Sequence, residues 1–525
     1  MSSEPVFTES TKHFIREFNR AIQRNDINHV GKLYEYEFGN HTNKFFKISA
    51  WPSAEVVADL INQNGNERER ENFLVLYKQL YYRHLLMKKL NSGIEAYFES
   101  FHNFIDLFNT LLGLRTEAPE FEIPASWCWD MIDEFTYQFS AFHIARHRVA
   151  DLTQQEKTEL DKDPHKWSAL TVENFLVGEN SFADKAMVRM SPQEREKKFL
   201  EGVGVPHILF ETLGVYALIG MLRVYTMTGD YTSGIDLIKC IDLNGNHENV
   251  CVPAAYTTLH YYLSFCYLST RRYEECVRTA TDGLIYLQRN RALLPRTYQK
   301  GNIEKMQEQM FGILAIATSL VPQRISESLA GDMRNRFGDQ IRRMRKMEKD
   351  AFKEVYNAVV PKFIPMKTLS GGFDTKSNPD EGLQLQTKVF MEEIESMSKV
   401  PDIYSYLKMC TAIHVDKLKN FLKESGDLTP KLLYLKHKTR SGSKYTGANN
   451  QEPIEDEKKR PKDQAEVKEN KAIPKAQDIQ FFVSDDMVHV NETRQRKQHA
   501  DFFIREVLRY ENIIRKVDKV GGGMY

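Results

Sequence analysis

Two histidines in the segment HIARH, His143 and His147, have a spacing that could bind a metal ion. Residues four apart share one face of a helix, so two imidazoles there could ligate zinc. Zinc peptidases with this spacing place a Glu directly after the first His as the general base, and Ile144 stands there in this chain. We therefore interpret both residues as ordinary helix histidines and predict no metal site.

Three acids in the segment WCWDMIDEF, namely Asp130, Asp133 and Glu134, have the residue types of an acid/base pair. They lie on the polar side of an amphipathic helix that we expect to start near Ser126. The opposite face is formed by Trp129, Ile132, Phe135 and Phe139. We predict that the acids form a solvated or salt-bridged face, and that the aromatic face lies in a core or a subunit interface.

Motifs for cofactors and nucleophiles are missing from the sequence. There is no phosphate-binding G-x-x-x-x-G-K-[ST] and no G-x-S-x-G nucleophile elbow, and Gly202 and Gly204 lack the third glycine of a dinucleotide fingerprint. The six cysteines show no C-x-x-C spacing: Cys128, Cys240, Cys251, Cys266, Cys276 and Cys410. We predict no catalytic residue, no cofactor and no small-molecule substrate, so the protein is not expected to be an enzyme.

The charges of the chain balance, with 72 Lys and Arg against 72 Asp and Glu. A protein that binds nucleic acid over a broad surface is usually basic. One local basic cluster, at Arg342, Arg343, Arg345 and Lys346, could make a weak contact with RNA phosphates or could be a solvated helix face. No apolar run of membrane-spanning length and no secretion signal is found, so we expect a cytoplasmic protein without a membrane contact.

Helical patterns dominate the elements that would position these residues. Segments 10–38 and 71–112 are helix-like, and two similar units follow 42 residues apart. In each unit a helix ends near a Thr, a polar turn follows, and a Tyr opens a second helix. The first unit has Thr228, Gly229-Asp230 and Tyr231, and the second has Thr270, Arg271-Arg272 and Tyr273. This pattern is typical of tetratricopeptide-like repeats, and a weaker third unit covers 307–329. Such solenoids bind partners and seldom carry chemistry.

The order of elements after the loose segment 361–379 is that of a winged helix. Three short helices are predicted around Leu407, Leu418 and Leu432, and a hairpin at 479–490 follows. Between helix and hairpin lies segment 441–475, where the stretch 455–471 has twelve charged residues out of seventeen. A segment of this composition cannot bury enough apolar surface to fold, so we predict a disordered insertion at 441–475.

The last predicted helix has a narrow apolar seam at steps of three and four residues. The seam consists of Phe503, Val507, Tyr510, Ile514 and Val517. It could pack back on the winged helix of its own chain, or it could join a bundle of helices from other subunits. The pattern alone favours neither.

Helical repeats followed by a winged helix and a terminal helix resemble the PCI family, which supplies scaffold subunits to the proteasome lid, the COP9 signalosome and translation initiation factor 3. The segments PASWCWDMIDEFTYQFSAF, MTGDYTSGIDLI, EKMQEQMFGILAIA, FFVSDDMVHV and DFFIREVLRYE are similar to the PCI subunits of factor 3. The insertion at 441–475 departs from the family pattern. The resemblance implies a non-catalytic scaffold in factor 3, beside its subunits K and E, which supports pre-initiation complex assembly on the small ribosomal subunit and mRNA recruitment.

The resemblance also implies a division of the chain into four regions. These are an N-terminal helical region at 1–115, helical repeats at 116–302, a PCI domain at 303–505 with its winged helix at about 401–495, and a C-terminal bundle helix at 496–520. In this family the terminal helices bundle, which favours the inter-subunit role for the seam. The alternatives are a PCI subunit of the proteasome lid or the signalosome, or a free tetratricopeptide-type adaptor.

Overall fold

The computed structural model describes most of the chain, and it divides the chain into two compact units, Met1–Glu395 and Ser396–Tyr525. The described residues are 8–61, 67–88, 94–113, 121–147, 155–158, 166–188, 190, 208–241, 252–292, 294, 297–321, 323, 325–364, 380–398, 400–423, 426–440, 479–492, 507 and 510. The predicted insertion at 441–475, most of the connector at 361–379, and Phe503, Ile514 and Val517 lie outside them.

The first unit opens with helices that cover the predicted segments 10–38 and 71–112. They are α1 (Glu9–Gln23), α2 (Ile27–Lys32), the π-helical turn η1 (Leu33–Glu37), α3 (Phe38–Phe45), α4 (Ala54–Ile61), α5 (Glu67–Met87) and α6 (Ile94–Leu111). The side chain of Thr8 caps α1 by accepting a hydrogen bond from the backbone N–H of Thr11. Buried aromatic side chains such as Phe18 and Phe73 join these helices.

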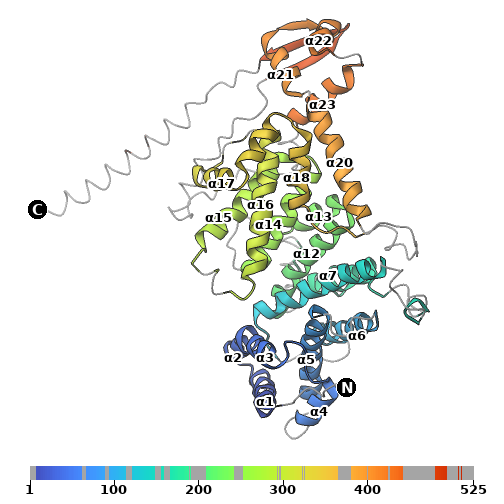
Figure 1. Cartoon of the computed structure of the whole chain (residues 1–525), viewed down its shortest axis with the longest axis vertical. Helices are drawn as coiled ribbons and strands as arrows, with labels where there is room; N and C mark the ends of the chain where they lie inside the picture. The colour runs from blue at the N-terminus through green and yellow to red at the C-terminus, as the bar shows by residue number, and fades with distance from the viewer. Residues whose placement is uncertain are drawn as a thin grey trace, which may run out of the picture. The chain divides into compact units, whose positions relative to one another are not determined.

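Helix α7 (Ala125–His147) connects this N-terminal layer to the rest of the unit, packing on α6 and on α12 (Ile208–Thr228) (Figure 1). It begins after Pro124, whose carbonyl accepts from the N–H of Cys128, so Ser126 lies inside the first turn and not at the start. Its predicted aromatic face is buried throughout, as expected for a core face. A Cβ at Gly220 of α12 would come within 2.7 Å of the Ile132 side chain, so a residue without a side chain is needed there.

The two repeat units are confirmed, with turns where the sequence predicts them. The first is α12 and α13 (Tyr231–Ile238), and the second is α14 (Pro253–Ser269) and α15 (Tyr273–Arg289). Both turns use the same hydrogen bonds. The N–H of Asp230 donates to the Tyr225 carbonyl at 2.9 Å, and the N–H of Arg272 donates to the Tyr267 carbonyl at 2.8 Å.

The residue before each of these turn amides has a left-handed backbone. Gly229 has φ +86° and Arg271 has φ +65°. Glycine adopts this conformation without strain, whereas arginine does so at a cost. The two turns thus share a backbone conformation although their residues differ at this position. The flanking Thr and Tyr residues are the ones that the two turns have in common.

The rest of the first unit completes a helical stack. Further helices are α9 (Ala169–Leu176), α10 (Phe182–Lys185), α16 (Lys300–Leu320), α17 (Glu327–Arg345), α18 (Lys349–Val359) and α20 (Glu381–Ser398). One continuous core runs from Phe14 to Ile394. The segment Leu209–Thr228 of α12 is long and apolar enough to cross a membrane. However, 72% of its apolar 18-residue stretch is buried within the unit, as for a core helix.

The second unit has the order predicted for a winged helix, with one addition. Its elements are α21 (Val400–Met409), β1 (Ala412–His414), α22 (Val415–Leu422), α23 (Thr429–Arg440), β2 (Ile479–Ser484) and β3 (Met487–Glu492). The strands form an antiparallel sheet in the order β1-β3-β2, with Ile413 opposite Val488. Strand β1 is not among the predicted elements, because it has only three residues and pairs with a segment far along the chain. Residues such as Leu418 and Val488 form a separate small core.

Candidate functional site

The inner face of the repeats is filled by the chain itself. Fourteen of the seventeen residues of α14 are buried, although the first helix of an open repeat would expose one face. Helices α12, α13, α15 and α16 surround it. The hydroxyl of Tyr261 donates to the carbonyl of Val359 at 2.8 Å, which ties the end of α18 to the same helix. The repeats therefore offer no open groove for a peptide along α14.

Helix α20 binds both repeat turns at equivalent positions. The hydroxyl of Tyr231, which opens α13, donates to the side-chain carbonyl of Gln386 at 2.9 Å. The hydroxyl of Tyr273, which opens α15, donates to the carboxylate of Glu393 at 3.2 Å. Glu393 is buried and also pairs with Arg271, with 2.9 Å between Nε and Oε2. Positions 42 residues apart in the repeats thus contact positions seven apart, or two helical turns, on α20.

A buried polar cluster around Asp130 joins four distant parts of the first unit. The Asp130 carboxylate accepts hydrogen bonds from the hydroxyl groups of Tyr34 and Tyr298 and from the side-chain amide of Gln299. Arg83 lies 3.1 Å from the same carboxylate. Tyr34 belongs to η1, Arg83 to α5, and Gln299 precedes α16. We call these five residues the Asp130 cluster.

The neighbouring acids of α7 are also paired. Asp133 forms an ion pair with Arg223 of α12, and Glu134 lies 3.9 Å from Arg83. Burial raises the pKa of both Asp133 and Glu134, against the attraction of the arginines. The predicted polar face of α7 is therefore salt-bridged, with Asp130 buried and the Asp133 side chain 30% exposed. The carboxylates pair with arginines of other helices, so the arrangement serves cohesion between helices.

His143 is buried and is held by contacts within the first unit. Its Nε2–H donates to the carbonyl of Trp167 at 3.0 Å, and its ring lies edge-on to Phe139. Burial lowers the pKa of His143 to about 4, so the imidazole is neutral at physiological pH. The side chain of His147 lies outside the described residues. Over the described part of the chain, no group of three or more His, Cys, Asp or Glu residues is arranged to hold a metal ion.

The predicted basic cluster lies at the C-terminal end of α17. Arg342 pairs with Asp339, and Arg343 lies 2.9 Å from Glu348 and 3.3 Å from Glu354. Arg345 and Lys346 are exposed. Positive side chains at the last turn of a helix are favoured by the helix dipole. Contact of this cluster with RNA remains a prediction.

The terminal seam is described at two of its five positions. Val507 and Tyr510 are helical and 57% and 61% exposed. Two large apolar side chains are thus open to solvent at these positions of the isolated chain. An inter-subunit role for the seam stays a prediction.

The sequence of this chain is similar to known sequences over most of its length. A family model described as RNA polymerase I-associated factor PAF67 matches residues 96–510. A relative from Danio rerio is 33% identical over 496 residues, which cover 93% of this chain and 81% of the relative. Relatives from Xenopus tropicalis and Homo sapiens are 33% and 32% identical, each over 93% of this chain and 83% of their own length. All three relatives are named eukaryotic translation initiation factor 3 subunit L.

The chain belongs to the family of subunit L of eukaryotic translation initiation factor 3.

The match to the PAF67 family model begins within α6 and ends at residue 510, the second described seam position. It includes both repeat turns, α20 and the winged helix, whereas Tyr34 and Arg83 precede it. Sequence reasoning missed the Asp130 cluster because its members are spread over the chain and each has an ordinary local context. It also missed α20, although Phe390, Ile394 and Met397 at steps of four and three indicate a helix.

Proposed function

We propose that this chain is a non-catalytic scaffold subunit of eukaryotic translation initiation factor 3. The observation that carries the proposal is the match over 93% of the chain to relatives named as subunit L of that factor. The proposed location is the cytoplasm, where translation factors act. As proposed neighbours in the complex we name subunits K and E, and as the proposed task we name support of pre-initiation complex assembly on the small ribosomal subunit and of mRNA recruitment.

The geometry of the described residues supports a scaffold. Ionisable groups of the first unit, such as Asp130 and Arg223, are tied to partners across helix interfaces, where they hold the unit together. The exposed Val507 and Tyr510 provide apolar surface of the kind that subunit contacts bury. We propose the seam at Phe503, Val507, Tyr510, Ile514 and Val517 as an inter-subunit contact, and the cluster Arg342, Arg343, Arg345 and Lys346 as a weak RNA contact.

The test is affinity purification of the tagged chain from its own cells, followed by mass spectrometry. We expect the other factor 3 subunits and small-ribosomal-subunit proteins to be recovered in proportion to the tagged chain. Recovery of proteasome-lid or signalosome subunits instead would preserve the fold and overturn the function. Recovery of RNA polymerase I subunits would favour the name attached to the family model.

A free tetratricopeptide-type adaptor is the alternative from another functional class. Such an adaptor binds peptides in the open groove of its repeats. Here α14 is buried by its own neighbours and α20 covers both repeat turns, which disfavours peptide binding at that face. Size-exclusion chromatography of cell extract separates the two functions, because an adaptor would elute largely alone and a scaffold subunit would elute with its complex.

A further inference from the structure

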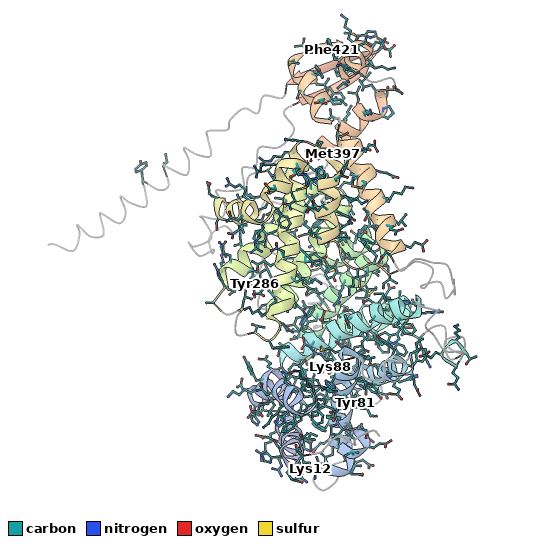
Figure 2. All side chains as sticks on the ribbon, viewed as in Figure 1. Lys12, Tyr81, Lys88, Tyr286, Met397 and Phe421 are labelled. Carbon is teal, nitrogen blue, oxygen red and sulfur yellow. The ribbon has the colours of Figure 1, made fainter. Side chains whose placement is uncertain are left out.

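An exposed phenylalanine stacks on a partly buried tyrosine on the helical side of the winged-helix unit. Phe421 of α22, labelled in Figure 2, is 54% exposed, although it is a large apolar side chain in a unit with a small core. Its ring stacks on Tyr406 of α21, with centroids 5.5 Å apart and planes at 16°. Phe421 therefore presents aromatic surface to solvent, whereas Tyr406 is partly buried and packs against the unit's core.

Two exposed lysines lie within four residues of Phe421 in the sequence. Lys417 is one helical turn before Phe421 on α22 and is exposed, and Lys423 directly follows the helix and is exposed as well. Segment 415–440 as a whole has seven Lys and Arg against three Asp and Glu, in a chain whose total charge is zero. The sequence of this segment is therefore locally basic despite the neutral total.

Two of the three acids of this segment have local roles. The Asp416 carboxylate lies 3.5 Å from His414 at the start of α22. Asp427 accepts a hydrogen bond from the backbone N–H of Thr429 at 3.0 Å, at the start of α23. The exposed Lys417 and Lys423 are thus available to a partner while these acids serve the helix starts.

The hairpin of the winged helix has the opposite charge. Its turn is Ser484-Asp485-Asp486, and both aspartates are exposed. A phosphate backbone would be repelled at this turn. Binding of the chain to nucleic acid through its wing is therefore disfavoured, and the helical side with Phe421 is the favourable side.

We propose that Tyr406, Phe421 and the lysines of α22 form a binding surface for single-stranded RNA, with a base stacked on Phe421 and adjacent phosphates at Lys417 and Lys423. Proteins that bind single strands combine aromatic stacking with a basic surround. Protein–protein interface cores, in contrast, are depleted in lysine, which disfavours a protein partner here. The proposal depends on the proposed function only for the choice of RNA over DNA.

The test measures binding of the purified full chain to a fluorescein-labelled twelve-nucleotide oligouridylate by fluorescence anisotropy, with the matching DNA as a second ligand. Phe421→Ala should weaken binding by at least about fivefold, because stacking on one aromatic side chain is lost. Phe421→Tyr should bind like the wild type. Lys417→Gln with Lys423→Gln should lower the slope of log affinity against log salt by about 1.4, since each phosphate contact contributes about 0.7.

The matched control is Lys305→Gln with Lys353→Gln, which removes the same charge at exposed positions of α16 and α18 and should leave binding unchanged. Circular dichroism checks that each variant is folded. The proposal is overturned if the wild-type chain does not bind, if only the control variant loses binding, or if DNA binds more tightly than RNA. It is also overturned if Phe421→Ala binds RNA normally but fails to recover factor 3 subunits, which would make the surface a protein contact. The last outcome leaves the proposed function intact.

Discussion

At the scale of single residues, the first unit contains buried charges that pair across helix interfaces. The Asp130 carboxylate is only 4% exposed and lies against Arg83, whose side chain is 24% exposed. Removing one partner of such a pair leaves an uncompensated charge in a poorly solvated place. Removing one partner of an exposed ion pair costs less, because water solvates the charge that remains.

Asp130→Asn tests this difference. The variant keeps the shape of the side chain but leaves Arg83 without its closest carboxylate, and we expect a loss of about 3 kcal/mol in the free energy of unfolding. Urea denaturation followed by circular dichroism measures it. The control is Asp339→Asn, which removes the partner of Arg342 at a site about four-fifths exposed and should cost less than about 1 kcal/mol. Equal effects of the two variants would contradict the account.

His143 makes stability depend on pH. Its pKa is lowered from 6.5 to about 4 by burial, so the unfolded chain binds a proton more readily than the folded chain. The stabilising contribution is fully present above about pH 6.5 and is lost as the pH falls towards 4, by about 1.4 kcal/mol for each pH unit. Protonation of Asp133 and Glu134, whose pKa values burial raises, acts in the opposite direction.

The contribution of His143 is therefore measured as a difference between two proteins. Urea midpoints of the wild type and of His143→Gln, taken from pH 7 to pH 4, should give a steeper decline for the wild type. Parallel curves would show that this imidazole stays neutral in both states or that another group sets the slope.

At the scale of elements, α20 contacts both repeat turns and holds them at a fixed spacing. Its contacts at Gln386 and Glu393 are matched by Tyr231 and Tyr273. The contact at Glu393 is the stronger one, because a buried carboxylate there meets both a hydroxyl and Arg271.

Glu393→Ala should therefore loosen α20 without unfolding the unit. We expect amide hydrogen exchange within 381–398 to rise at least about tenfold, the result of losing about 1.4 kcal/mol or more of local stability. Mass spectrometry of peptic peptides reports it. Gln384→Ala, an exposed change on the same helix, should leave exchange unchanged. If both variants exchange alike, α20 is held by its apolar contacts alone.

The terminal seam is the second element with a testable role. Tyr510→Asp with Ile514→Asp would place two charges in the seam, and burying an unpaired charge in an interface is costly. Tyr510 is exposed in the isolated chain, so we expect the variant to fold normally and to be recovered with factor 3 subunits at less than about a tenth of the wild-type amount. Recovery at wild-type levels would show that the seam is not an interface.

At the scale of the whole molecule, the two largest hydrophobic clusters of the described residues are separate. One includes buried residues from Phe14 to Ile394, and the other, centred on Leu418 and Val488, belongs to the winged-helix unit. Small cores contribute little stability, since the fraction of surface buried rises with size. The second unit should therefore be the weaker one.

Scanning calorimetry should show two unfolding transitions, the smaller at lower temperature. A chain that ends after Ser398 should lose the smaller transition and keep the larger one within about 2 °C. A single transition in the full chain, or a large shift in the shortened one, would mean that the units unfold together.

How far the sequence predicts this structure depends on the range of the interactions. The repeat turns were predictable because Thr228, Tyr231 and their equivalents act on neighbours within a few residues. Strand β1 was not, because Ala412–His414 is a strand only through its pairing with β3. The Asp130 cluster could not be predicted from the sequence for the same reason, since Tyr34 and Tyr298 come together only in the folded unit. The role of α20 required knowing that two turns face one helix.

The register between the repeat turns and α20 limits how the length of this chain can vary between relatives. One residue added between Gln386 and Glu393 would rotate the rest of α20 by about 100° and turn Glu393 away from Tyr273. One residue added between α13 and α14 would leave this register within α20 unchanged. We therefore expect relatives to differ in length more readily between α13 and α14 than within 386–393.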